Sequence, residues 1–220
     1  PGWKVYWSNP GDSGQATRVK VTAPQGWHVG PVQWPFPKQF DQFGDVGYGY
    51  ENEVVLMVDV IPPRGVGVGT QHTIDVEVNW AACGTACVPG SAKFAVDTHI
   101  GYRPADVDIT TFQEWKKQLP MTDEPFAKAI TPPKSGADSW TAQLRWTSKV
   151  TDLHFYPNTP GGLKLKPLKL SHEGTLTTIR YKPDFSGVTS DLAKPMAEGL
   201  LLYKADDQIV RGVMTKLPIG

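Results

Sequence analysis

The two cysteines of this chain, Cys83 and Cys87, lie four positions apart within 220 residues. A pair this close can form a disulfide and exchange it with another protein, provided that the backbone bends between the thiols. The Cα atoms of a disulfide are roughly 4.4–6.8 Å apart, whereas four extended residues span about 13 Å. Gly84 and Ala86 allow a bend at little steric cost. The spacing therefore favours a redox-active disulfide on a turn.

Other roles for the thiols stay open on spacing alone. An inert disulfide closing so short a loop would restrict the unfolded chain by only about 2 kcal/mol, which makes it a weak staple. A closed zinc site needs four Cys or His ligands, and the sequence has no second cysteine pair. The histidines are scattered singly, at positions His28, His72, His99, His154 and His172.

Composition and charge exclude several classes of protein. Lys plus Arg and Asp plus Glu each number 22, so no net field attracts nucleic acid or an anionic membrane. No apolar run approaches the roughly 18–20 residues of a membrane span. The 20 prolines and 22 glycines indicate many turns, which is typical of β structure. We therefore expect an all-β protein with no nucleic-acid partner.

Alternating apolar residues predict a hairpin around the cysteines. Residues 73–80 and 93–100 both alternate with period two, and turn-forming residues separate them. Shorter strands are expected earlier in the chain, at residues 5–7, 18–22, 29–34 and 53–61. Together they predict a β-sandwich domain over residues 1–105 that carries the thiols.

The pattern changes after residue 105. Residues 108–119 place apolar side chains at helical spacing, and Pro120 ends the run. We expect residues 106–135 to hold a short connecting helix and a linker. Strand patterns resume at residue 139 and predict a second small β-sandwich domain over residues 136–220, which contains no cysteine.

Four blocks resemble a known family. Residues 5–14, 32–38, 48–56 and 80–90 are similar, in order, to the N-terminal periplasmic region of DsbD-type thiol:disulfide interchange proteins, most of all in the ScsB branch (suppressor of copper sensitivity). The resemblance implies an immunoglobulin-like sandwich without a cofactor. It implies periplasmic location, electrons received from a transmembrane domain through a thioredoxin-like domain, and reduction of periplasmic partners. The full-length protein would then carry a membrane tether.

The same resemblance assigns roles to particular residues. Cys87 takes the place of the sulfur that forms the mixed disulfide with partners, and Cys83 that of the resolving sulfur. Related domains shield the pair with an aromatic cap loop, and the aligned glycine-rich region contains Tyr48 and Tyr50. We expect one of these tyrosines to cover the disulfide. The alternative is that both pack in the core at the start of the next strand.

The leading hypothesis is thus a periplasmic thiol-disulfide exchange domain that works through Cys83 and Cys87. One rival is a structural or partner-binding β-sandwich module with an inert disulfide. A second rival is a copper-binding module that uses the two thiolates. Reducibility separates exchange from a staple, because structural disulfides have potentials below about −300 mV.

Overall fold

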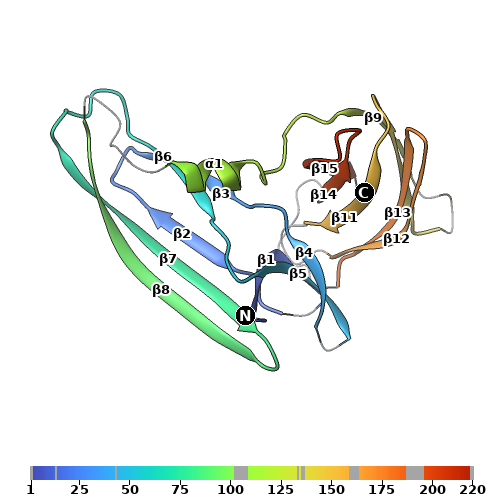
Figure 1. The fold of residues 1–220 in the computed structure, drawn as a ribbon, viewed down its shortest axis with the longest axis horizontal. Helices are drawn as coiled ribbons and strands as arrows, with labels where there is room; N and C mark the ends of the chain where they lie inside the picture. The colour runs from blue at the N-terminus through green and yellow to red at the C-terminus, as the bar shows by residue number, and fades with distance from the viewer. Residues whose placement is uncertain are drawn as a thin grey trace. The chain divides into compact units, whose positions relative to one another are not determined.

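The computed structural model describes residues 2–12, 14–42, 44–101, 109–132, 134, 137–158, 164–186 and 196–218. The chain divides into two compact units, Pro1–Leu119 and Pro120–Gly220. The described residues form fifteen strands and one short helix (Figure 1). The prediction of an all-β protein with a short helix is confirmed.

The first unit contains a six-stranded antiparallel sheet and a separate two-stranded sheet. In the larger sheet the order is β2-β7-β1-β5-β4, and β8 pairs with β7. The smaller sheet consists of β3 and β6. The strands are β1 (Lys4–Gly11), β2 (Arg18–Thr22), β3 (His28–Gln33), β4 (Lys38–Gln42), β5 (Asp45–Glu51), β6 (Met57–Ile61), β7 (Gln71–Cys83) and β8 (Cys87–His99).

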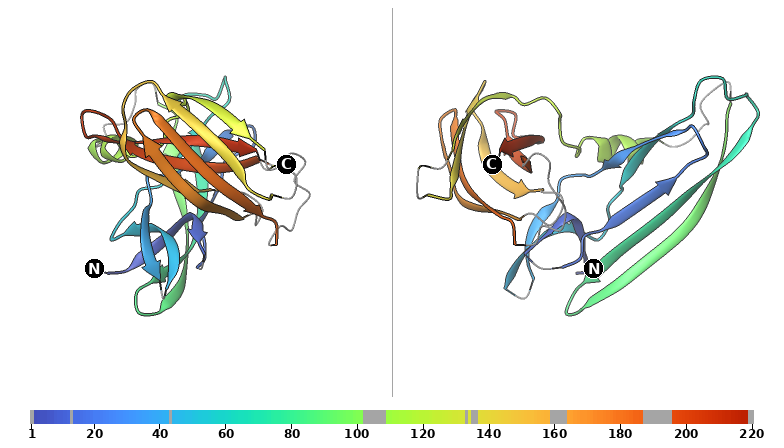
Figure 2. Two further views of the ribbon diagram at one scale, coloured as in Figure 1. Left: turned by 90° about the vertical axis from the view of Figure 1, so that its right-hand side faces the viewer. Right: turned by 180° about the vertical axis from the view of Figure 1, so that it is seen from behind.

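The long hairpin β7–β8 dominates the first unit. Its two strands pair from Gln71↔His99 to Cys83↔Cys87, and β8 runs along the outer side of β7 while β2 lies on the other side (Figures 1 and 2). The apolar face of β7, from Ile74 to Trp80, lines a groove of about 760 Å³ together with residues of β2 and β6. The alternation in residues 73–80 therefore gave the correct strand and the correct apolar face.

The single helix is shorter than its sequence pattern. Helix α1 spans Thr110–Lys116, within the expected range 108–119, and belongs to the first unit. Residues 106–108 lie outside the described part of the chain. The helix contains no buried residue, although Phe112 and Lys116 help to line the groove. The helix buries no residue and has no side-chain hydrogen bond at its N-cap, so little tertiary packing stabilises it. Only about two turns are therefore helical.

The second unit has two antiparallel sheets, one ordered β12-β13-β10-β9 and the other β11-β14-β15. Apolar side chains of both sheets form one core, which includes Trp146, Ile179 and Leu201. The strands are β9 (Phe126–Thr131), β10 (Trp140–Trp146), β11 (Thr151–Pro157), β12 (Lys164–Glu173), β13 (Leu176–Asp184), β14 (Met196–Lys204) and β15 (Val210–Pro218).

Strand β9 lies inside residues 106–135, where we expected only a helix and a linker. It pairs along its whole length with β10, from Phe126↔Trp146 to Thr131↔Thr141. Its partly buried face presents Phe126, Lys128 and Ile130. A lysine in the middle of this face breaks the apolar alternation, which is why the sequence pattern did not indicate a strand.

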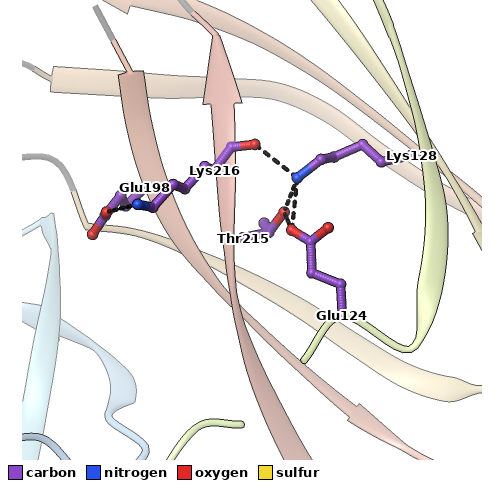
Figure 3. Close-up of polar contacts among 5 residues, drawn as sticks. All are labelled: Glu124, Lys128, Glu198, Thr215 and Lys216. Carbon is purple, nitrogen blue, oxygen red and sulfur yellow. Dashed lines mark hydrogen bonds and ion pairs between the residues drawn. The ribbon is translucent and has the colours of Figure 1, made fainter. Parts of the chain in front are cut away.

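A polar cluster accommodates Lys128 (Figure 3). Its ammonium group donates hydrogen bonds to Glu124 Oε1 at 2.6 Å and to Thr215 Oγ1 at 3.1 Å. It also donates to the carbonyl oxygen of Lys216 at 3.0 Å. Thr215, which is fully buried, in turn donates to Glu124 Oε1 at 2.6 Å. The charge at the end of the lysine therefore has three oxygen partners.

Candidate redox site

The two cysteines are joined in a disulfide at the turn of the β7–β8 hairpin. They are opposite each other in the strand register, and their Cα atoms are 4.1 Å apart. Residues Gly84 to Ala86 make the turn, and the Gly84 amide donates a hydrogen bond to the Ala86 carbonyl at 3.0 Å. The predicted bend and the predicted disulfide are both present.

The two sulfur-bearing residues differ in exposure. Cys83 is 0% exposed, whereas Cys87 is exposed. The difference follows from the strand pairing, because Cys83 is paired with Lys4 of β1 on one side and with Cys87 on the other. Cys87 begins β8, which is paired on one side only among the described residues. A partner can therefore reach one residue of the pair and not the other.

A hollow of about 270 Å³ lies beside the disulfide. Both cysteines line it, with Ala81 and Pro89 from the same hairpin. The other wall comes from Tyr6, Gly14 and Gln15, which are about seventy positions away in sequence. The hollow gives a side chain or a backbone segment of a partner room next to the sulfur atoms.

Aromatic side chains pack around the buried sulfur. Tyr6, 1% exposed, forms a small core cluster with Ala81 and Cys83, and Phe40 packs against it. The rings of Tyr6 and Phe40 are 5.7 Å apart between centroids. Burial raises the pKa of the Tyr6 phenol, so the ring remains neutral beside the disulfide. These residues fix Cys83 in an apolar environment.

The tip of the hairpin has two further neighbours. The indole of Trp3 lies against Gly84, about 3.5 Å from where a side-chain carbon would project. Gln42, a buried residue at the end of β4, points its amide nitrogen at the Gly84 carbonyl at 3.5 Å. Both contacts hold the backbone between the two cysteines.

Tyr48 and Tyr50 do not lie over the disulfide. In β5, Tyr50 is opposite Val5 of β1, whereas Cys83 is opposite Lys4. Adjacent residues of a strand point to opposite faces, so Tyr48 and Tyr50 lie on the face away from Cys83. Both are buried, and the Tyr50 hydroxyl donates to the Pro35 carbonyl at 2.8 Å. This corrects the expectation of a cap and corresponds to the core alternative.

Sequence reasoning missed the residues that do surround the pair. Tyr6 stands in one of the blocks that carry the family resemblance, but nothing in its local pattern relates it to Cys83. Gln42 is 42 positions from Gly84 in sequence, and Trp3 is farther still. Their approach to the hairpin tip follows from the pairing of β1 with β7, of β5 with β1 and of β4 with β5.

Metal ligands are not grouped in the described part of the chain. No set of three or more His, Cys, Asp or Glu residues there could hold a metal ion. Likewise, no helix among the described residues is long and apolar enough to cross a membrane.

The fold and the site together define a β-sandwich protein that presents a disulfide at a hairpin tip. Residues 1–98 match the family model described as "Thiol:disulfide interchange protein DsbD, N-terminal". The match confirms the resemblance that the sequence blocks indicated for this part of the chain. The fold is all-β and immunoglobulin-like, as expected.

A solved structure has the same fold along the whole chain. The N-terminal periplasmic domain of ScsB from Proteus mirabilis matches with a TM-score of 0.69 and 20% sequence identity. The match covers 100% of this chain and 84% of that chain. At this identity the likeness concerns the fold. No curated protein matches the sequence.

Proposed function

We propose that the chain is a periplasmic thiol-disulfide exchange protein that accepts electrons from a membrane-linked, thioredoxin-like donor and reduces periplasmic partners. The observation that carries this proposal is the unequal exposure of the pair, with Cys83 fully buried and Cys87 exposed. Exchange requires one sulfur that a partner can reach. The family match of residues 1–98 supports the same chemistry.

Reduction of the pair takes two steps. A donor thiolate attacks the sulfur of Cys87, a mixed disulfide forms, and Cys83 leaves as a thiolate. The second donor thiolate then attacks the donor sulfur that is bonded to Cys87. The donor's disulfide forms, and Cys87 is released as a thiolate. Two electrons have passed to this chain, and protons from solvent complete the two thiols.

Transfer to an oxidised partner runs the same steps in the other direction. The Cys87 thiolate attacks the partner's disulfide and forms a mixed disulfide with it. Cys83 then attacks the Cys87 sulfur, which restores the intramolecular disulfide and releases the partner in its reduced form. In this scheme Cys87 carries the covalent bond to every partner, and Cys83 only resolves it.

Lys4 supports the role of Cys83 as leaving group. It is opposite Cys83 in the register of β1 and β7, so both side chains lie on one face of the sheet. Its ammonium nitrogen lies 5.0 Å from the centroid of the Phe40 ring, and Phe40 packs against the cluster that contains Cys83. A nearby cation stabilises a thiolate and thereby favours opening of the disulfide.

Trapping of mixed disulfides tests the assignment of the two sulfurs. The Cys83→Ser and Cys87→Ser variants are mixed with a thioredoxin-like domain, and products are separated by non-reducing electrophoresis and identified by mass spectrometry. We expect Cys83→Ser, which retains the exposed thiol, to trap the covalent complex, and Cys87→Ser to trap little. The opposite pattern would reverse the roles.

A redox titration of the unmodified chain tests exchange against an inert staple. A midpoint in the range of thioredoxin-like proteins, about −270 to −120 mV, supports exchange. A midpoint far below about −300 mV, with no trapping by either variant, would identify a structural disulfide.

A further inference from the structure

Strand β8 is an edge strand with an unpaired side. It pairs with β7 along its whole length, and no other described strand pairs with it. Figures 1 and 2 show it along the outer side of the hairpin. Its outward N–H and C=O groups can therefore accept another strand. Pro89 interrupts these donors near the disulfide, whereas residues 91–99 contain no proline.

Two apolar side chains in this segment are unusually exposed. Phe94 is 51% exposed and Val96 is 44% exposed. They lie on the same face of the sheet, opposite Val76 and Ile74 of β7. An apolar row that stops at the edge of a sheet favours a partner strand that continues it.

The segment is complementary to itself when two copies run antiparallel about Ala95. In that register Lys93 of each copy is opposite Asp97 of the other, and Phe94 is opposite Val96 of the other. On one face an apolar row would then run from Val76 through Phe94 into the second copy. On the other face the Lys93 charge would lie between Glu77, now 3.2 Å away, and the Asp97 of the second copy.

We infer that β8 is a homodimerisation edge, at which two copies of this chain join antiparallel through residues 91–99 centred on Ala95. The charge and apolar complementarity of one short segment with itself favours a second copy over an unrelated strand. The pairing is nine residues long and buries little area, so the dimer is weak and depends on protein concentration.

The dimer leaves the redox site accessible. Cys87 lies eight residues from Ala95, which is about 26 Å along an extended strand. The two hairpin tips therefore point away from the common axis in opposite directions. Dimerisation through β8 and exchange at Cys87 are consequently separable, and failure of one would not imply failure of the other.

Charge reversals at Lys93 and Asp97, two positions on either side of Ala95, test the register. Sedimentation velocity over a concentration series should show a monomer–dimer equilibrium for the unmodified chain. Asp97→Lys and Lys93→Asp each create two like-charge pairs, and each should weaken dimerisation by about tenfold or more. An equimolar mixture of the two variants should form a heterodimer, because the two lysines of the Asp97→Lys chain then face the two aspartates of the Lys93→Asp chain.

A matched control is Asp206→Lys, which makes the same charge change at an exposed turn of the second unit and should dimerise like the unmodified chain. Circular dichroism melts establish that each variant is folded. A chain that stays monomeric throughout the series, a dimer that Asp97→Lys leaves intact, or a mixture that stays monomeric would each overturn the inference. Pairing of β8 only with an unrelated protein strand would overturn it as well.

Discussion

Gly14 lies directly against the ring of Tyr6, so closely that a methyl group at position 14 would be 2.3 Å from Tyr6 Cζ. The backbone of Gly14 also has a φ of 111°, which residues with a side chain rarely adopt. Both residues line the hollow beside the disulfide. The position of the Tyr6 ring beside Cys83 therefore depends on the lack of a side chain at Gly14, about seventy residues from Cys83 in sequence.

Gly14→Ala should displace the Tyr6 ring and open the apolar environment of Cys83. We expect reduction of the disulfide by dithiothreitol to become faster, with a loss of about 1–3 kcal/mol in the free energy of unfolding. The rate is followed by thiol titration, and stability by urea unfolding. The matched control is Gly65→Ala, where φ is 89° and nothing lies within 4 Å of the added carbon. It should lose some stability without a change in the reduction rate, and equal rates in both variants would contradict the role of Gly14.

Tyr50→Phe should affect folding stability and leave the disulfide chemistry unchanged. The substitution removes the hydrogen bond to the Pro35 carbonyl and leaves that buried acceptor without this donor. The expected loss is about 1–2 kcal/mol in the free energy of unfolding. Replacing both Tyr48 and Tyr50 by alanine should destabilise the domain further. Faster reduction by dithiothreitol with unchanged stability would instead support a cap.

Thr215→Val should lower the free energy of unfolding, because it removes two hydrogen bonds from the polar cluster around Lys128 (Figure 3). Valine keeps the shape of the buried side chain but neither accepts from the lysine nor donates to Glu124. We expect a loss of about 1–2 kcal/mol, measured by urea unfolding. The control is Lys216→Met, which removes an exposed ion pair with Glu198 at 3.7 Å and should change stability by about 0.5 kcal/mol or less. Equal effects would mean that the cluster contributes no more than the surface pair.

Asp207 should contribute to stability in a pH-dependent way. Hydrogen bonds from the Arg211 guanidinium and from the Ile209 amide lower the pKa of its carboxyl from 3.8 to about 2 in the folded chain. A lowered pKa stabilises the folded state above the unfolded pKa, and the stabilisation is lost as the pH falls from about 4 toward 2. The stability difference between the unmodified chain and Asp207→Asn should thus shrink below about pH 4. In an Arg211→Gln background this pH dependence should become smaller, and a difference that stays constant with pH would contradict the ion pair.

The sequence predicted those parts of the fold that depend on local pattern. Alternation in residues 73–80 and 93–100 located β7 and β8, and two cysteines with small residues between them located the disulfide. The face on which a tyrosine lies is not local information. Tyr48 and Tyr50 alternate with glycines, and only the pairing of Val5 with Tyr50 decides which face the rings occupy.

The sequence pattern did not predict strand β9 for a related reason. Lys128 occupies a position where an alternating strand would carry an apolar residue, and its partner Thr215 is 87 positions away. The polar group is accommodated by contacts that no window of sequence contains. The hollow beside the disulfide was likewise unpredictable, since Tyr6, Gly14 and Cys83 meet only through the sheet.

Cys83 is held between β1 and β8 by pairing on both sides, and this has a kinetic consequence. In the proposed exchange, with a partner bound covalently at Cys87, this pairing would keep the freed sulfur of Cys83 next to the bond that it must attack. Its effective concentration there can exceed by orders of magnitude that of any thiol in solution. We therefore expect the covalent complex to be short-lived, so that few electrons are diverted to free thiols outside the protein.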